Sequence, residues 1–125
     1  IEFLQDELNW TIPEKTELDT LINNLGGSKL AGRKLKGNGP FLWDPPNNAT
    51  NESSFIALPG GAFFYNKYSD INQKTFFWSG SKKYHDADPY SYMSFKITNS
   101  DAAIVGMELD YLYSLSVRCI KNQPK

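Results

Sequence analysis

The first clear pattern along the chain is a stripe of apolar residues at helical spacing. It consists of Leu18, Leu21, Ile22 and Leu25. Residues three or four positions apart lie on one face of a helix, so the stripe predicts an amphipathic helix with one buried face. Pro13 suits the first helical turn, which would place the cap at Thr11 or Ile12. Gly26 and Gly27 follow the last apolar position and predict the end of the helix.

A second, shorter helix is predicted from Ser28 towards Leu35, with Ser28 available as its cap. Gly32 weakens this helix, because glycine costs about 1 kcal/mol relative to alanine inside a helix. A basic cluster accompanies it: Arg33, Lys34 and Lys36. Clusters of this kind are typical of solvated faces, and we expect this helix to be weak and to face solvent.

Turn-forming residues replace the helical pattern from residue 37 to residue 54. Runs rich in Gly, Pro and Asn at residues 37–40 and 44–48 flank a short apolar stretch that ends in Trp43. This pattern predicts a long, ordered surface loop held in place by Trp43. The apolar residues 55–58 and the following Pro-Gly-Gly then predict a buried strand entering a sharp turn, with Phe55 and Leu58 facing the core.

The second half of the chain has the composition of strands. Aromatic runs at residues 62–66 and 75–79, joined by the polar residues 67–74, predict a hairpin. Residues 91–97 alternate, with Met93, Phe95 and Ile97 on one face and Tyr92, Ser94 and Lys96 on the other. That period of two predicts a half-buried strand, and further strands are expected at residues 102–109 and 116–121. Helices followed by strands indicate an α+β fold.

Composition narrows the class of protein. With 125 residues, of which 40% are hydrophobic, we expect one domain (residues 1–125) with its own core. The 13 basic and 14 acidic residues give a net charge of -1, which lacks the basic surface of nucleic-acid-binding proteins. No apolar run approaches the roughly 20 residues that a membrane helix requires. We therefore expect no nucleic-acid partner and no insertion of this chain into a membrane.

The metal-binding and catalytic motifs that the sequence suggests are incomplete. Asp86 and Asp88 have the spacing that opens a calcium loop, but no Gly falls at the sixth position and Ile97 stands where the closing Glu should be. Cys119 is the only cysteine, which excludes an internal disulfide and a cysteine-rich metal site. The chain contains no nucleophile elbow and no phosphate loop. We expect no metal, no cofactor and no enzymatic activity.

Aromatic residues in or beside polar loops are the best candidates for contacting a ligand. Aromatic faces stack on sugar rings and anchor protein interfaces. With their polar neighbours, the candidate ligand-binding residues are Trp43, Tyr65, Tyr84, His85, Asp86, Asp88 and Tyr90. The alternative is that such rings only pack, as we expect for Trp10, Phe55, Phe76 and Trp78.

Several short motifs occur in an order that resembles a known family. They are Trp10-Thr11-Ile12-Pro13, Gly26-Gly27, Ala31-Gly32-Arg33-Lys34-Leu35-Lys36, Phe55-Ile56-Ala57-Leu58-Pro59-Gly60-Gly61, Phe77-Trp78-Ser79 and Ser116-Val117-Arg118-Cys119-Ile120-Lys121. Together they resemble the Fibrobacter succinogenes major paralogous domain family over about residues 10–122. That family is similar to the C-type lectin-like fold of sulfatase-modifying-factor domains. The resemblance implies an α+β fold with two N-terminal helices packed on a twisted antiparallel sheet with long loops.

The resemblance also shapes the functional expectation. It implies a bacterial protein that is exported, or lipid-anchored at the outer-membrane surface, and whose leader has been removed. With the loop aromatics, this favours a non-catalytic module that binds polysaccharide or another surface protein. One alternative is a structural or adhesion domain of a larger surface assembly, without a small-ligand pocket. Another is an unusual enzyme of the modifying-factor type, although its two-cysteine copper chemistry cannot operate with Cys119 alone.

Overall fold

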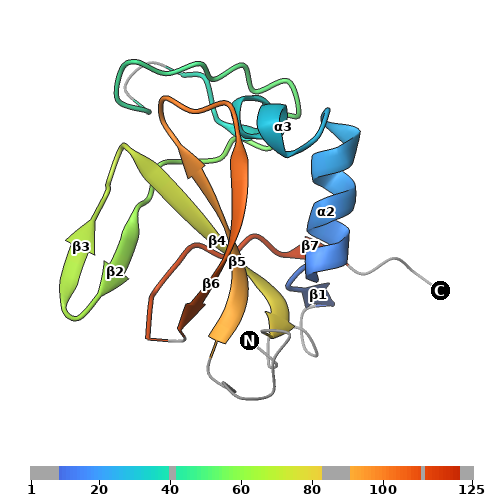
Figure 1. Cartoon of the computed structure of the whole chain (residues 1–125), viewed down its shortest axis with the longest axis vertical. Coiled ribbons are helices and arrows are strands. Elements are labelled where there is room, and N and C mark those ends of the chain that lie inside the picture. Colours follow the sequence, from blue (N-terminus) through green and yellow to red (C-terminus); the bar gives the residue numbers. More distant parts are fainter. Residues whose placement is uncertain (1–8, 40–41, 83–90, 111, 122–125) are drawn as a thin grey trace.

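The computed structural model describes residues 9–39, 42–82, 91–110 and 112–121. Its helices and antiparallel strands confirm the α+β class (Figure 1). In chain order the elements are β1 (Trp10–Thr11), α2 (Lys15–Asn24), α3 (Ser28–Leu35), β2 (Ala62–Phe64), β3 (Lys67–Ser69), β4 (Lys74–Lys82), β5 (Ser91–Thr98), β6 (Ile104–Asp110) and β7 (Ile120–Lys121). Among the described residues, none of the helices has the length and apolar character needed to cross a membrane.

A three-stranded antiparallel sheet in the order β4-β5-β6 forms the centre of the fold. Phe77 pairs with Phe95 and Ile97 pairs with Ile104 across the strands. These side chains form the core together with Ile22 of α2 and Leu35 of α3, so both helices cover the same face of the sheet. The predicted alternation in β5 holds only in part: Phe95 and Ile97 are buried on this face, but Met93 is only partly buried and Ser94, expected on the opposite face, is fully buried.

Helix α2 confirms the predicted amphipathic helix, but it begins later than expected. Its N-cap is Glu14, and the Glu14 amide donates to Oε1 of Glu17, 3.1 Å away. The preceding residues are held in extended structure, because β1 pairs with β7 and the Pro13 carbonyl accepts the Gly80 amide. A cap at Thr11 would break that pairing. The helix ends as predicted at two glycines with positive φ.

The second helix, α3, packs more tightly than its sequence indicates. Gly32 is buried, and a Cβ at this position would lie 2.2 Å from the Ala103 carbonyl oxygen. The glycine therefore permits close approach of α3 to the turn before β6. Lys36, directly after the helix, has no exposed surface. The prediction that this basic cluster faces solvent is wrong for Lys36.

The long loop is ordered around Trp43, as predicted. Trp43 is buried, and its Nε1 donates to the Ala57 carbonyl at 3.1 Å. Residues 55–58 do not form a regular strand; Ala57 makes a single parallel bridge to Lys36. Phe55 packs on Phe77 with 5.6 Å between the ring centroids, whereas Leu58 is 54% exposed. The expectation that Leu58 faces the core is therefore wrong.

The hairpin in the second half of the chain differs from the predicted one. Strand β2 pairs with β3, inside the segment expected to be a polar turn, rather than with β4. The connection is a two-residue turn in which Tyr65 and Asn66 have φ of 50° and 58°. Positive φ at both central residues matches the twist of a hairpin, so the chain reverses much earlier than the strand composition suggests. In Figure 1 this hairpin projects away from the central sheet and from the helices.

The predicted C-terminal strands are confirmed in place but not in length. Strand β6 begins two residues later than predicted, at Ile104. The expected strand at residues 116–121 is reduced to β7, which pairs with β1. Ser116 instead makes an isolated bridge to Phe77. The pairing of β1 with β7 places residues 10 and 121 side by side.

Candidate functional site

The structure separates the candidate ligand-binding residues. Tyr84, His85, Asp86, Asp88 and Tyr90 lie outside the described residues. The other two, Trp43 and Tyr65, belong to different parts of the fold.

Trp43 has the environment of a core residue. Only 4% of its surface is exposed, and its indole N–H is already bonded to the Ala57 carbonyl. One face of its ring lies 5.6 Å from Nζ of Lys36. A ligand at the surface has no access to this ring, so Trp43 has a structural role.

Tyr65, in contrast, lies at the tip of the β2–β3 hairpin and is 79% exposed. Tyr68, on β3, is 71% exposed, and its ring centroid lies 4.6 Å from that of Phe63. Two tyrosines with this exposure on one short hairpin are informative, because large exposed apolar surfaces often mark interaction sites. We call β2, β3 and their connecting turn the aromatic hairpin.

Three rings are in contact along one side of the aromatic hairpin, although the Tyr65 ring is tilted by 52° relative to that of Phe64. Phe64 lies between Tyr65, at a centroid distance of 4.0 Å, and Tyr113, at 3.9 Å. The Phe64 and Tyr113 rings are nearly parallel, with 5° between their planes. The stack fixes the hairpin against the segment after β6. We call Tyr65, Phe64 and Tyr113 the aromatic stack.

Grooves lie on both sides of the aromatic hairpin. The first, the Phe64 groove, has a volume of about 360 Å³. It is lined by Ala62, Phe64, Lys67, Ser69, Asp70, Phe76, Met107, Leu109 and Tyr113. The second, the Phe63 groove, has a volume of about 260 Å³ and includes Tyr68, Ser114 and Ser116 in its lining. Apolar walls with a few polar groups are typical of ligand sites.

The charged residues of the Phe64 groove are not all neutralised. The Asp70 carboxylate lies 3.8 Å from Nζ of Lys74, so it has a cationic neighbour. Lys67 is exposed, and the described part of the chain places no carboxylate within ion-pair distance of its Nζ. The groove therefore carries an uncompensated positive charge.

A second polar centre surrounds Lys36, on the helix side of the molecule. Four oxygens surround its ammonium and share its three N–H donors: Asn48 Oδ1, Thr98 O, Asn99 O and Asp101 O. The distances are 2.6 to 3.0 Å. Burial lowers the pKa of Lys36 to about 8, because the charged form loses its hydration, and the Asp101 carboxylate opposes this shift. The centre is inaccessible, which gives it a structural role rather than a binding role.

The acidic side chains and the cysteine of the described residues are dispersed over the fold. Within residues 9–39, 42–82, 91–110 and 112–121, no group of three or more His, Cys, Asp or Glu side chains is placed to hold a metal ion. Cys119 is a free, partly buried thiol.

The sequence pattern places Tyr65 among the candidate residues but does not bring out the residues that accompany it. Lys67 and Tyr68 lie in the segment expected to be a polar turn, and no motif marks Tyr113. Asn66 was an available signal, because asparagine adopts positive φ readily and often marks a tight hairpin turn. The contact between Phe64 and Tyr113 joins residues far apart in the chain, and no local pattern predicts it.

One family of known proteins matches the sequence of this chain. The family model described as the Fibrobacter succinogenes major domain matches residues 8–121. No curated protein and no solved structure matches the chain.

Proposed function

The chain belongs to the Fibrobacter succinogenes major domain family, and from that premise we propose that it is a non-catalytic binding module at a bacterial cell surface. Its ligand is a polysaccharide or another surface protein, and the aromatic hairpin makes the contact. We further propose that the protein is exported, and that its helices and sheet are arranged as in the C-type lectin-like fold.

The observation that carries this proposal is the exposure of the tyrosines on the aromatic hairpin. Tyr65 and Tyr68 are 79% and 71% exposed beside grooves that run along both sides of the hairpin. Exposing large rings forgoes the free energy of burying them, roughly 1.5 to 3 kcal/mol for a large apolar side chain. A binding partner that covers the rings would recover that free energy, which gives their exposure a functional explanation.

The second candidate function is a structural or adhesion domain in a larger surface assembly. The same exposed rings would then pack permanently against a neighbouring domain. The grooves beside the hairpin favour a ligand-binding module, because a flat packing surface does not require them.

A glycan array with the soluble domain tests the proposal directly. We expect wild-type protein to bind at least one class of glycan. The double variant Tyr65→Ser/Tyr68→Ser should lose roughly 5- to 150-fold in affinity, because each aromatic contact contributes about 0.5 to 1.5 kcal/mol. Leu30→Ser is the matched control, since Leu30 is 40% exposed on α3, away from the hairpin.

The outcomes separate the two candidates. Binding that is lost in the hairpin variant and kept in the control supports a glycan-binding module. Absence of binding to every glycan contradicts the polysaccharide ligand. A surface protein that still binds the hairpin variant with full affinity would contradict the assignment of the hairpin as the binding site.

A further inference from the structure

The Phe64 groove combines a stacked aromatic wall with an apolar floor. Phe64 and Tyr113 form the wall, 3.9 Å apart and nearly parallel. Phe76, Met107 and Leu109 come from β4 and β6 and complete the apolar lining. A ligand that fits this groove must therefore present an apolar face, as the C–H face of a pyranose ring does.

The charge of the groove selects among such ligands. Lys67 is the direct cross-strand neighbour of Phe64, so its ammonium lies beside the aromatic wall. Asp70 lines the same groove but already has Lys74 as its partner at 3.8 Å. The remaining positive charge favours an anionic ligand, since complementary charges raise both specificity and the rate of association.

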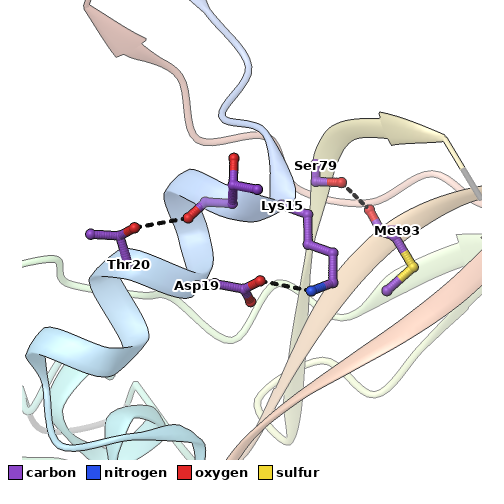
Figure 2. A network of polar contacts seen from close by, with 6 residues as sticks. Lys15, Asp19, Thr20, Ser79 and Met93 are labelled. Atoms are coloured by element: carbon purple, nitrogen blue, oxygen red, sulfur yellow. Dashed lines mark hydrogen bonds and ion pairs between the residues drawn. The ribbon is translucent and has the colours of Figure 1, made fainter. Parts of the chain in front are cut away.

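Two other hollows lack this combination. A groove of about 380 Å³ between α2 and the central sheet contains Lys15 and Asp19, but these two neutralise each other at 2.7 Å. Figure 2 shows their contact along the side of α2, close to the Ser79 to Met93 hydrogen bond that links β4 and β5. The Phe63 groove contains aromatic rings but has no charged residue in its lining.

We propose that the Phe64 groove binds a negatively charged sugar residue of a polysaccharide, with the apolar face of the sugar ring against the apolar lining of the groove and the anionic group paired with Lys67. Ser69 and Asp70 provide polar groups for the sugar hydroxyls. The groove volume of about 360 Å³ lies within the roughly 300 to 1,000 Å³ typical of ligand sites. This inference rests on the proposed function and names the ligand class of the same surface.

The anionic group can be a carboxylate, as in a uronic acid, or a sulfate ester. Isothermal titration calorimetry with matched probes distinguishes them. The probes are a short oligouronate, its methyl ester (which has the same rings without the charge), a sulfated neutral oligosaccharide and a short polyglutamate peptide. The protein variants are Lys67→Gln, Lys67→Arg and, as a control, Lys29→Gln on the exposed side of α3.

We expect an anionic oligosaccharide to bind at least tenfold more tightly than its uncharged counterpart. Lys67→Gln should abolish that preference, Lys67→Arg should keep it, and Lys29→Gln should leave it unchanged. Added salt should weaken the binding, because the pair is exposed to solvent. All variants are at exposed positions, and a thermal melt of each checks that it remains folded.

Each contrary result has a defined meaning. Equal binding of the oligouronate and its methyl ester, or an unchanged preference in Lys67→Gln, overturns the anionic ligand but leaves the binding module intact. Polyglutamate that binds as tightly as the sugars overturns a sugar ligand in favour of an acidic peptide. Absence of binding to every glycan, charged or neutral, overturns this inference together with the polysaccharide version of the proposed function.

Discussion

The ammonium of Lys36 lies 2.6 Å from the side-chain oxygen of Asn48, which joins the end of α3 to the long loop. The carbonyl oxygens of Thr98, at the end of β5, and of Asn99 and Asp101, in the turn before β6, lie around the same ammonium. Lys36 thus links segments that are 12 to 65 residues away in the sequence. Four oxygens surround the buried ammonium, as oxygen ligands surround a bound metal cation. The lysine side chain takes the place of such a cation.

The first prediction concerns the stability that this linkage provides. Lys36→Met should lower the free energy of unfolding by about 3 kcal/mol or more, because it leaves buried oxygens without donors at a cost of about 1 to 3 kcal/mol each. Urea denaturation measures the loss. The control is Lys29→Met, an exposed position on α3, which should change stability by less than about 0.5 kcal/mol. Equal stability of the two variants would contradict a structural role for Lys36.

The second prediction is the pH dependence of that contribution. The pKa of Lys36 falls from 10.5 to about 8 on folding, because burial removes water from the ammonium more than Asp101 compensates. Below pH 8 both the folded and the unfolded chain hold the proton. Between pH 8 and 10.5 the unfolded chain binds more protons than the folded chain. The contribution of Lys36 to the free energy of unfolding therefore rises with pH in this range.

The difference in unfolding free energy between wild type and Lys36→Met isolates the pH-dependent contribution of Lys36, because the other titrating groups are the same in both proteins. The difference should be constant below pH 8 and should grow in favour of wild type up to pH 10.5. A difference that is flat across both ranges would show that Lys36 keeps its ordinary pKa.

The third prediction separates the adjacent glycines before β2. Gly61 has φ of +67°, and a Cβ there would lie 2.2 Å from the Ser69 carbonyl oxygen. A Cβ on Gly60 would meet only Ser116 Oγ at 3.5 Å, an ordinary contact. Gly61→Ala should therefore cost about 2 to 5 kcal/mol through strain and overpacking, and Gly60→Ala less than about 1 kcal/mol. Thermal denaturation of the two variants provides the comparison, and the reverse order would contradict the account.

The fourth prediction treats Trp43 as a structural residue. Trp43→Phe removes the hydrogen bond to the Ala57 carbonyl and should cost about 1 to 3 kcal/mol of stability. The carbonyl keeps its second donor, the Gly37 amide at 3.0 Å, which limits the loss. At a temperature where the variant is folded, its ligand affinity should equal that of wild type. Weaker binding by folded protein would mean that Trp43 acts on the site after all.

Local patterns predicted the parts of the fold that depend on neighbours in the chain. The amphipathic helix α2 is of this kind and was confirmed, as was the burial of Phe95 and Ile97 on one face of β5. The burial of Lys36 could not be predicted, because its acceptors come from residues distant in sequence and lysine is rarely buried. The hairpin was misplaced because Tyr65 takes a positive φ, which bulky residues seldom do, at a turn without glycine.

The central claim is that ligand binds at the aromatic hairpin, and a two-dimensional amide NMR titration with the best-binding glycan tests it most directly. The account predicts that the amide signals of residues 62–69 and Tyr113 shift, with Lys67 among the largest changes. Signals from α2 should remain in place. Shifts confined to residues 84–90, with the hairpin signals unchanged, would contradict the account and assign binding to that other segment.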